Sequence, residues 1–176
     1  MRASLGTGSM HKARRAIRRQ DGGLPWDRGV DTACDVSPVW LSAGMAHLIM
    51  FDEDDLFLHR VREIASSFPD AAEKVSHGRP VFYTTKIFAY YGGSVKVAGG
   101  HEQHDQSVVV LLDPAEREAL LQEERCFFPA YLGPCGWLGI DLTDHTDWGE
   151  IRELMETSYR RTAGPRRVAR LDSRSR

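Results

Sequence analysis

The chain has 176 residues, 41% of them hydrophobic and 27% charged, which suits one globular domain and excludes two full-sized domains or a barrel enzyme of the usual size. No apolar run approaches the roughly eighteen residues that a membrane-spanning helix needs, which argues against a membrane protein. The formal net charge of −2 hides a segregation: residues 1–28 carry about +5, residues 160–176 about +6, and the stretch between them about −13.

Residues 1–44 show no sustained apolar periodicity and are rich in Gly, Arg, Ser and Asp, which predicts a disordered basic leader. A compact pattern begins after this leader, so we expect the true start at Met45 or Met50, with the leader upstream of it. The leader lacks the apolar stretch of a secretory signal peptide, and we therefore expect a cytoplasmic protein. Residues 164–176 form a second basic segment and are predicted to be a disordered tail.

The first predicted element is a helix whose apolar residues recur at spacings of three and four: Phe57, Val61, Ile64 and Phe68. After a polar bend, three short strands are predicted, joined by connections of two or three residues that make them antiparallel neighbours; they span residues 80–83, 87–91 and 94–97. A polar loop over residues 98–106, with turn glycines at its start, then leads into a continuous apolar strand over residues 107–112.

The second half begins with Asp113 at a helix N-cap, Pro114 at the first helical position and Glu116 at the third, which is a capping box for a short helix. Residues 127–136 contain two prolines and two glycines and are predicted to be an ordered loop. The alternation over residues 137–142 predicts a strand with one buried face, and Asp147 can cap a last helix that ends before Gly164. This order predicts an α+β fold of two layers, an antiparallel sheet of about five strands with helices packed on it.

The sequence contains no recognisable catalytic or cofactor motif. The string His-Glu-Gln-His-Asp over residues 101–105 has imidazoles three residues apart, which is not the spacing of the HExxH zinc-protease motif. It lies between glycines and a strand, so we expect a polar loop without a metal ion. Nucleophile elbows, P-loops and dinucleotide-binding glycine motifs are also missing from the sequence. We therefore expect a protein that is not an enzyme and that has no cofactor.

Basic and aromatic side chains gather on and between the predicted hairpin strands. The lysines and the arginine of this set suit phosphate groups, and the tyrosine suits a sugar or a base; the candidates are Arg79, Lys86, Lys96 and Tyr83. The alternative is structural, since strand aromatics usually pack against helices and isolated lysines are usually solvated. Because the middle of the chain is acidic, binding to nucleic acid has to depend on the basic ends or on one locally basic face.

Several strings in this order resemble the MmcQ/YjbR family: Ser-His-Gly-Arg-Pro over 76–80, the hairpin over 81–90, Leu-Asp-Pro-Ala-Glu over 112–116, Pro-Ala-Tyr-Leu-Gly over 129–133, Gly-Trp-Leu-Gly-Ile-Asp over 136–141 and Glu-Thr-Ser-Tyr over 156–159. The resemblance covers about residues 50–163. It implies a small stand-alone bacterial protein with a two-layer α+β fold likened to type III secretion chaperones. It also implies a DNA-binding label based on a double-wing motif, without established catalytic residues.

The resemblance draws attention to Trp137, which the alternation places on the face opposite Leu138 and Ile140. Together with Tyr131 and His77, it is our candidate for a shallow pocket that takes a small ligand. We expect a non-enzymatic module that binds DNA through hairpin wings and basic tails. The alternatives are a protein-interaction adaptor of chaperone-like fold and a small-ligand binding protein.

Overall fold

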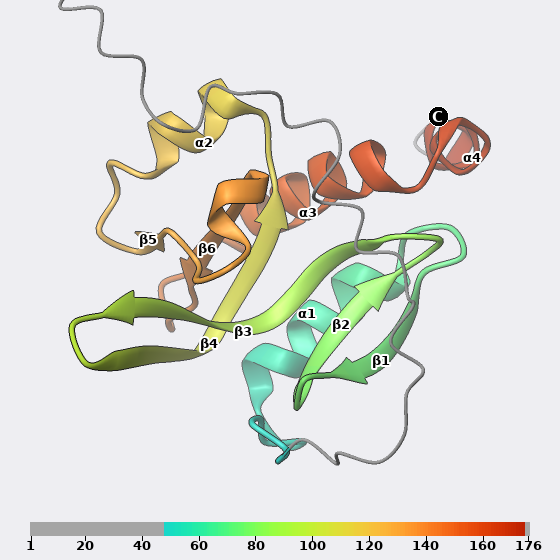
Figure 1. Cartoon of the computed structure of the whole chain (residues 1–176). Helices are drawn as coiled ribbons and strands as arrows, with labels where there is room; N and C mark the ends of the chain where they lie inside the picture. The colour runs from blue at the N-terminus through green and yellow to red at the C-terminus, as the bar shows by residue number, and fades with distance from the viewer. Residues whose placement is uncertain (1–47, 175–176) are drawn as a thin grey trace, which may run out of the picture.

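The computed structural model describes residues 48–174, so the predicted leader over residues 1–44 lies outside the described residues. The described chain folds in the order shown in Figure 1: α1 (Leu56–Ser66), β1 (Ala72–Ser76), β2 (Arg79–Tyr83), β3 (Ile87–Val97), β4 (Gly100–Leu111), α2 (Pro114–Leu120), β5 (Cys126–Phe127), the short 3-10 helix η1 (Gly133–Cys135), β6 (Trp137–Asp141), α3 (Trp148–Thr162) and α4 (Pro165–Arg174).

Within residues 48–174, six strands form one antiparallel sheet in the order β1-β2-β3-β4-β6-β5. Helices α1 and α3 lie on the same face of this sheet (Figure 1). The α+β fold of two layers is thereby confirmed, with six strands where about five were expected. Each helix in the described part of the chain is too short or too polar to cross a membrane.

The main core lies between the sheet and helices α1 and α3. Val61 on α1, Phe88 on β3 and Ile140 on β6 are fully buried there, as the periodicity predicted. Trp137 is also buried, but it belongs to a second cluster on the opposite face of the sheet, with Val109 and Phe127. The alternation rule therefore placed Trp137 and Ile140 correctly on opposite faces of β6.

The β3–β4 hairpin is longer than predicted. Gly92 and Gly93 do not form a turn; β3 continues through them with a register shift at this point, and Gly92 has φ of 75°. The turn lies at residues 98–99, and the predicted polar loop over residues 98–106 is wrong because most of it belongs to β4. A β-bulge uses glycine for the same positive φ as a tight turn, so the sequence signal was ambiguous.

The predicted polar bend contains strand β1, which pairs only with β2 and forms one edge of the sheet. Its residues are mostly exposed, so the apolar alternation that marks a strand is missing. At the other edge, the two-residue β5 pairs with β6 inside the segment that was predicted to be a loop.

Helix caps agree in part with the predictions. Asp147 caps α3 by accepting from Gly149 N at 2.8 Å, and Asp55 caps α1 by accepting from Phe57 N at 2.9 Å. Asp113 makes no side-chain cap on α2, because its carboxylate forms an ion pair with Arg161 on α3 instead.

The predicted disordered tail over residues 164–176 is wrong, since α4 fills most of it. Gly164 adopts φ of 82° between α3 and α4, a backbone conformation that glycine takes readily. Leu171 is only 5% exposed and belongs to the main core, with Val168 half-buried one turn earlier. The arginines dominated the composition of this segment and obscured its short apolar face.

Candidate nucleic-acid interface

Helix α4 presents a row of arginines. Arg166, Arg170 and Arg174 are exposed and follow one another at intervals of four residues, which corresponds to a rise of about 6 Å and to one face of the helix. The helix lies beyond the C-terminal end of α3, at one end of the molecule (Figure 1). One end of the protein thus carries a line of guanidinium groups.

Arg167 connects this helix to the sheet. Its Nη1 donates to Thr85 Oγ1 at 3.0 Å and to the Ala163 carbonyl at 3.1 Å. Thr85 lies in the connection between β2 and β3, immediately before the exposed Lys86. The contact brings a predicted hairpin lysine next to the predicted basic tail. We call the surface formed by Lys86, Arg166, Arg167, Arg170 and Arg174 the basic end.

Asp70 is the acidic residue that contacts the basic end. Its Oδ2 accepts a hydrogen bond from Arg170 Nη1 at 2.7 Å and from Arg167 Nε at 3.3 Å. The hydrogen bond from Arg170, and the charges of both arginines, hold the pKa of Asp70 below its usual value. The preceding residue, Pro69, accepts a hydrogen bond at 2.7 Å from the hydroxyl of the buried Tyr159, which fixes this loop to α3.

Other arginines near the end of α3 are neutralised. Arg160 forms ion pairs with Glu156 and Asp172, both at 2.7 Å, and Arg161 pairs with Asp113. By contrast, Arg166 and Arg174 make no ion pair with any residue in the range 48–174. These two side chains are the most available cations of the basic end.

Arg79, a predicted phosphate contact, is already occupied. Its Nη2 donates to Asp105 Oδ1 at 2.7 Å and to Gln103 Oε1 at 2.8 Å, and the side chain is only 11% exposed. A Cβ on Gly92 would lie 1.9 Å from Arg79 Nη1, so the guanidinium fills the space that this glycine leaves. The contacts of Arg79 hold β2 against the β3–β4 hairpin.

The other hairpin candidates are dispersed. The ammonium group of Lys74 lies 4.9 Å from the ring centre of Tyr83, which is half-buried. Lys96 is exposed near the hairpin turn, ten residues after Lys86 and roughly 30 Å from it along an extended strand. The hairpin projects from the molecule at the end opposite to α4 (Figure 1). The structure therefore places the two lysines on separate surfaces.

A family model described as YjbR matches residues 66–161, which is more than half of the chain. The chain belongs to the YjbR family. Among solved structures, it is similar to the crystal structure of Deinococcus radiodurans protein DR2400, described with the domain DUF419. The two are 18% identical, the alignment covers 58% of this chain and 75% of that chain, and the TM-score is 0.44. No curated protein matches the chain.

In this YjbR-family protein, the three residues of the expected ligand pocket are not brought together. His77 lies in the exposed β1–β2 turn, whereas Trp137 is buried on β6 with its ring 5.1 Å from that of Tyr90. Strands β3 and β4 separate β2 from β6 in the sheet. Tyr131 is 81% exposed, with φ of 64°, and its ring stacks on that of His101 at 5.6 Å.

The string over residues 101–105 lies on β4 and not in a loop. His104 Nδ1 lies 2.8 Å from Asp141 Oδ1 on β6, and the imidazole stacks on the ring of Phe127 at 4.0 Å. These contacts fasten the hairpin to the rest of the sheet. No group of three or more His, Cys, Asp or Glu side chains in the described part of the chain is arranged to hold a metal ion.

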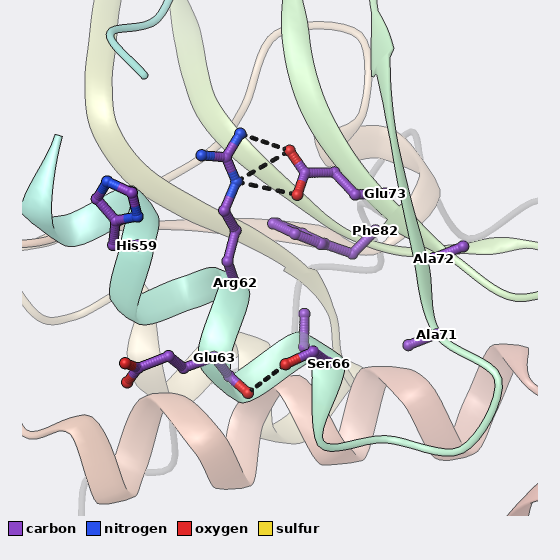
Figure 2. Close-up of a pocket in the computed structure, with 9 residues that line it drawn as sticks. His59, Arg62, Glu63, Ser66, Ala71, Ala72, Glu73 and Phe82 are labelled. Carbon is purple, nitrogen blue, oxygen red and sulfur yellow. Dashed lines mark hydrogen bonds and ion pairs between the residues drawn. The ribbon is translucent and has the colours of Figure 1, made fainter. Parts of the chain in front are cut away.

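A cavity of about 350 Å³ lies between α1 and β1. Figure 2 shows Arg62 reaching from α1 to Glu73 on β1, where its Nε and Nη2 donate to the carboxylate at 2.8 to 3.1 Å. Glu53 also pairs with Arg62 at 2.8 Å, and the Glu73 hydrogen bond is the main reason that the pKa of Arg62 is raised. Phe82, which is buried, forms an apolar wall of the cavity.

The sequence interpretation missed the residues that assemble the basic end. Asp70, Thr85 and Arg167 are far apart in the chain, and each is an ordinary polar surface residue in its local sequence. The four-residue spacing of Arg166, Arg170 and Arg174 was visible and would have indicated one helical face, had the tail been interpreted as a helix.

Proposed function

We propose that this protein binds nucleic acid, DNA in the first instance, by contacting the phosphate backbone with the basic end. The observation that carries the proposal is the row of Arg166, Arg170 and Arg174 on the exposed face of a helix whose other face is docked on the core. Guanidinium groups donate to phosphate oxygens in a bidentate manner, and a row of them suits successive phosphates.

The hairpin has a smaller role in this proposal than the sequence suggested. In the part of the hairpin near its turn, Lys96 on β3 lies opposite His101 on β4, while the acidic Glu102 lies opposite Val95. Arg79 is neutralised by Asp105. Residues 29–159 carry a net charge of about −13, which opposes contact between most of the domain surface and DNA phosphates. Binding is therefore confined to the two basic terminal segments of the chain, residues 1–28 and 160–176, and the second of these supplies the arginines of the basic end. Because phosphate contacts carry no sequence information, we expect little sequence preference.

The test removes two cations of the basic end without disturbing an ion pair of the described chain, in the double variant Arg166→Gln, Arg174→Gln. Binding of a fluorescein-labelled 20-base-pair duplex to the full chain is measured by anisotropy over a salt series. We expect the double variant to bind at least tenfold more weakly than the wild type at about 50 mM salt. The salt slope should fall by about 1.8, since each lost phosphate contact removes about 0.9.

The control is Arg60→Gln, Arg152→Gln, which removes the same charge from exposed positions on α1 and on the first half of α3. It also removes the exposed ion pair of Arg60 with Glu63 on α1. The control should reduce affinity less than threefold. Equal weakening by both double variants would assign the effect to net charge and contradict the proposed surface. Wild-type protein that leaves the duplex unbound at about 50 mM salt would contradict nucleic-acid binding itself.

The second candidate function is that of a protein-interaction adaptor, and one observation favours it. Strand β1 pairs only with β2 among the described strands, and its residues Ala72 and Glu73 line the α1–β1 cavity. An extended peptide that pairs with β1 can place an apolar side chain against Phe82. Because one Arg62 is shared by Glu53 and Glu73, the rim is acidic and suits a basic peptide.

The probe for this candidate is the peptide Lys-Val-Trp-Val-Lys with blocked ends, titrated into isotope-labelled full-length protein. We expect saturable shifts of the backbone amide signals of β1, and loss of binding in Ser66→Trp, which fills the cavity from α1. The control is Arg60→Trp, an exposed position on α1 that does not line the cavity. Shifts that are dispersed over the whole surface, or unchanged binding by Ser66→Trp, would contradict the adaptor function.

A further inference from the structure

The basic end already contains an internal anion. One oxygen of the Asp70 carboxylate lies between two guanidinium groups, 2.7 Å from Arg170 Nη1 and 3.3 Å from Arg167 Nε. We infer that this carboxylate oxygen occupies a phosphate subsite, formed by Arg167 and Arg170 beside Lys86, and that a nucleic-acid phosphodiester competes with Asp70 for it. The inference rests on the proposed function and concerns the regulation of the same surface.

The chemistry of the two anions supports the exchange. A carboxylate and a phosphodiester each carry one negative charge, and both accept charge-assisted hydrogen bonds from guanidinium N–H groups. The Asp70 pair is accessible, because the side chains of Asp70 and Arg170 are 42% and 52% exposed. An ion pair so open to solvent contributes little to stability, so an incoming phosphate can displace the carboxylate at small cost to the fold.

The position of α4 does not depend on Asp70 alone. Leu171 is buried in the main core, and Arg167 keeps its hydrogen bonds to Thr85 and to the Ala163 carbonyl. When a phosphate displaces Asp70, α4 therefore keeps its position, Arg167 stays bonded to Thr85, and the N–H donors of Arg167 and Arg170 that contacted Asp70 are released. The subsite then lies beside the exposed cations of Arg166 and Arg174, which extends the phosphate-binding row.

The loop that carries Asp70 is held independently. Tyr159 donates to the carbonyl of Pro69 from the core side, and Asp70 itself has φ of 57°, a conformation that few non-glycine residues adopt. The hydrogen bond from Arg170 lowers the pKa of Asp70, so the carboxylate is ionised at neutral pH, where the binding assay is done.

The experiment compares Asp70→Asn with Asp172→Asn in the anisotropy assay with the 20-base-pair duplex. Asparagine tolerates a positive φ, so the first variant keeps the backbone. Both variants remove one negative charge near α4, but Arg160 keeps Glu156 as a partner when Asp172 is changed. We expect Asp70→Asn to bind about three- to tenfold more tightly than the wild type, with a salt slope steeper by about 0.9 to 1.8. Asp172→Asn should change affinity less than twofold.

The outcomes separate this inference from the proposed function. If the wild type binds the duplex, and Asp70→Asn and Asp172→Asn bind it with equal affinity, the subsite is overturned and the proposed function stands. A duplex bound by Asp70→Asn but not by the wild type at about 50 mM salt would support masking by Asp70 and contradict the proposed function for the wild-type chain. Failure of the wild type and of both variants to bind at about 50 mM salt would overturn the function and the subsite together.

Discussion

Replacing Ile140 by alanine is expected to lower the free energy of unfolding by about 2–5 kcal/mol. Ile140 is fully buried on β6, where it pairs with Val108 on β4 and with Cys126 on β5. Its side chain points into the main core, which leaves little room for the surroundings to close around a smaller residue. Urea unfolding followed by circular dichroism measures the change.

The control for this variant is Val97→Ala, which shortens a side chain that is 41% exposed near the hairpin turn. It should change stability by less than about 0.5 kcal/mol. A midpoint for Ile140→Ala that coincides with the wild type would mean that the core face of β6 is assigned wrongly.

Replacing Ser158 by alanine is expected to cost about 2–4 kcal/mol, although only one oxygen atom is removed. The Ser158 hydroxyl on α3 is fully buried; it donates to the carbonyl of Phe88 on β3 and accepts from Leu111 N on β4 at 3.0 Å. Since Ala89 pairs with Val110, Phe88 and Leu111 are the next partners of the ladder, and the hydroxyl bridges them. Its loss leaves the buried Phe88 carbonyl and the part-buried Leu111 N–H unpaired. A buried polar group without a partner costs about 1–3 kcal/mol.

The matched variant is Ser66→Ala on α1, whose exposed hydroxyl donates only to the Glu63 carbonyl of the same helix. We expect its effect on urea unfolding to stay below about 0.5 kcal/mol. If Ser158→Ala were as mild as Ser66→Ala, the two strands would have to close the gap and bond directly, and the bridging role of Ser158 would be refuted.

Periodicity predicted the elements that bury one face. The spacing of Val61 and Ile64 marked α1, and the alternation around Ile140 marked β6, because burial imposes a pattern on the sequence. Strand β1 is an exposed edge and carries no such pattern. Helix α4 buries only Leu171. One buried apolar residue among so many arginines gives no periodic signal, so the composition predicted a disordered tail.

The candidate site was predictable in its parts and not in its assembly. The sequence pointed to Lys86 and to the arginines at the C-terminal end as separate candidates. Their proximity depends on the contact of Arg167 with Thr85, 82 residues apart, which no local spacing encodes. The ion pair of Arg79 with Asp105 could not be predicted either, because the two residues are 26 positions apart. From the sequence alone, Arg79 was therefore interpreted as free to bind phosphate.

The strand order also has a consequence for folding of the chain during its synthesis on the ribosome. Strands β1 to β4 are consecutive neighbours with connections at residues 77–78, 84–86 and 98–99, so their pairing has a low loop-closure cost and can precede the rest. Until β6 and α3 are synthesised, β4 has a free edge and the side chains of Phe88 and Val110 lack their cover. Such a nascent meander is prone to self-association, and completion of α3 ends that vulnerability.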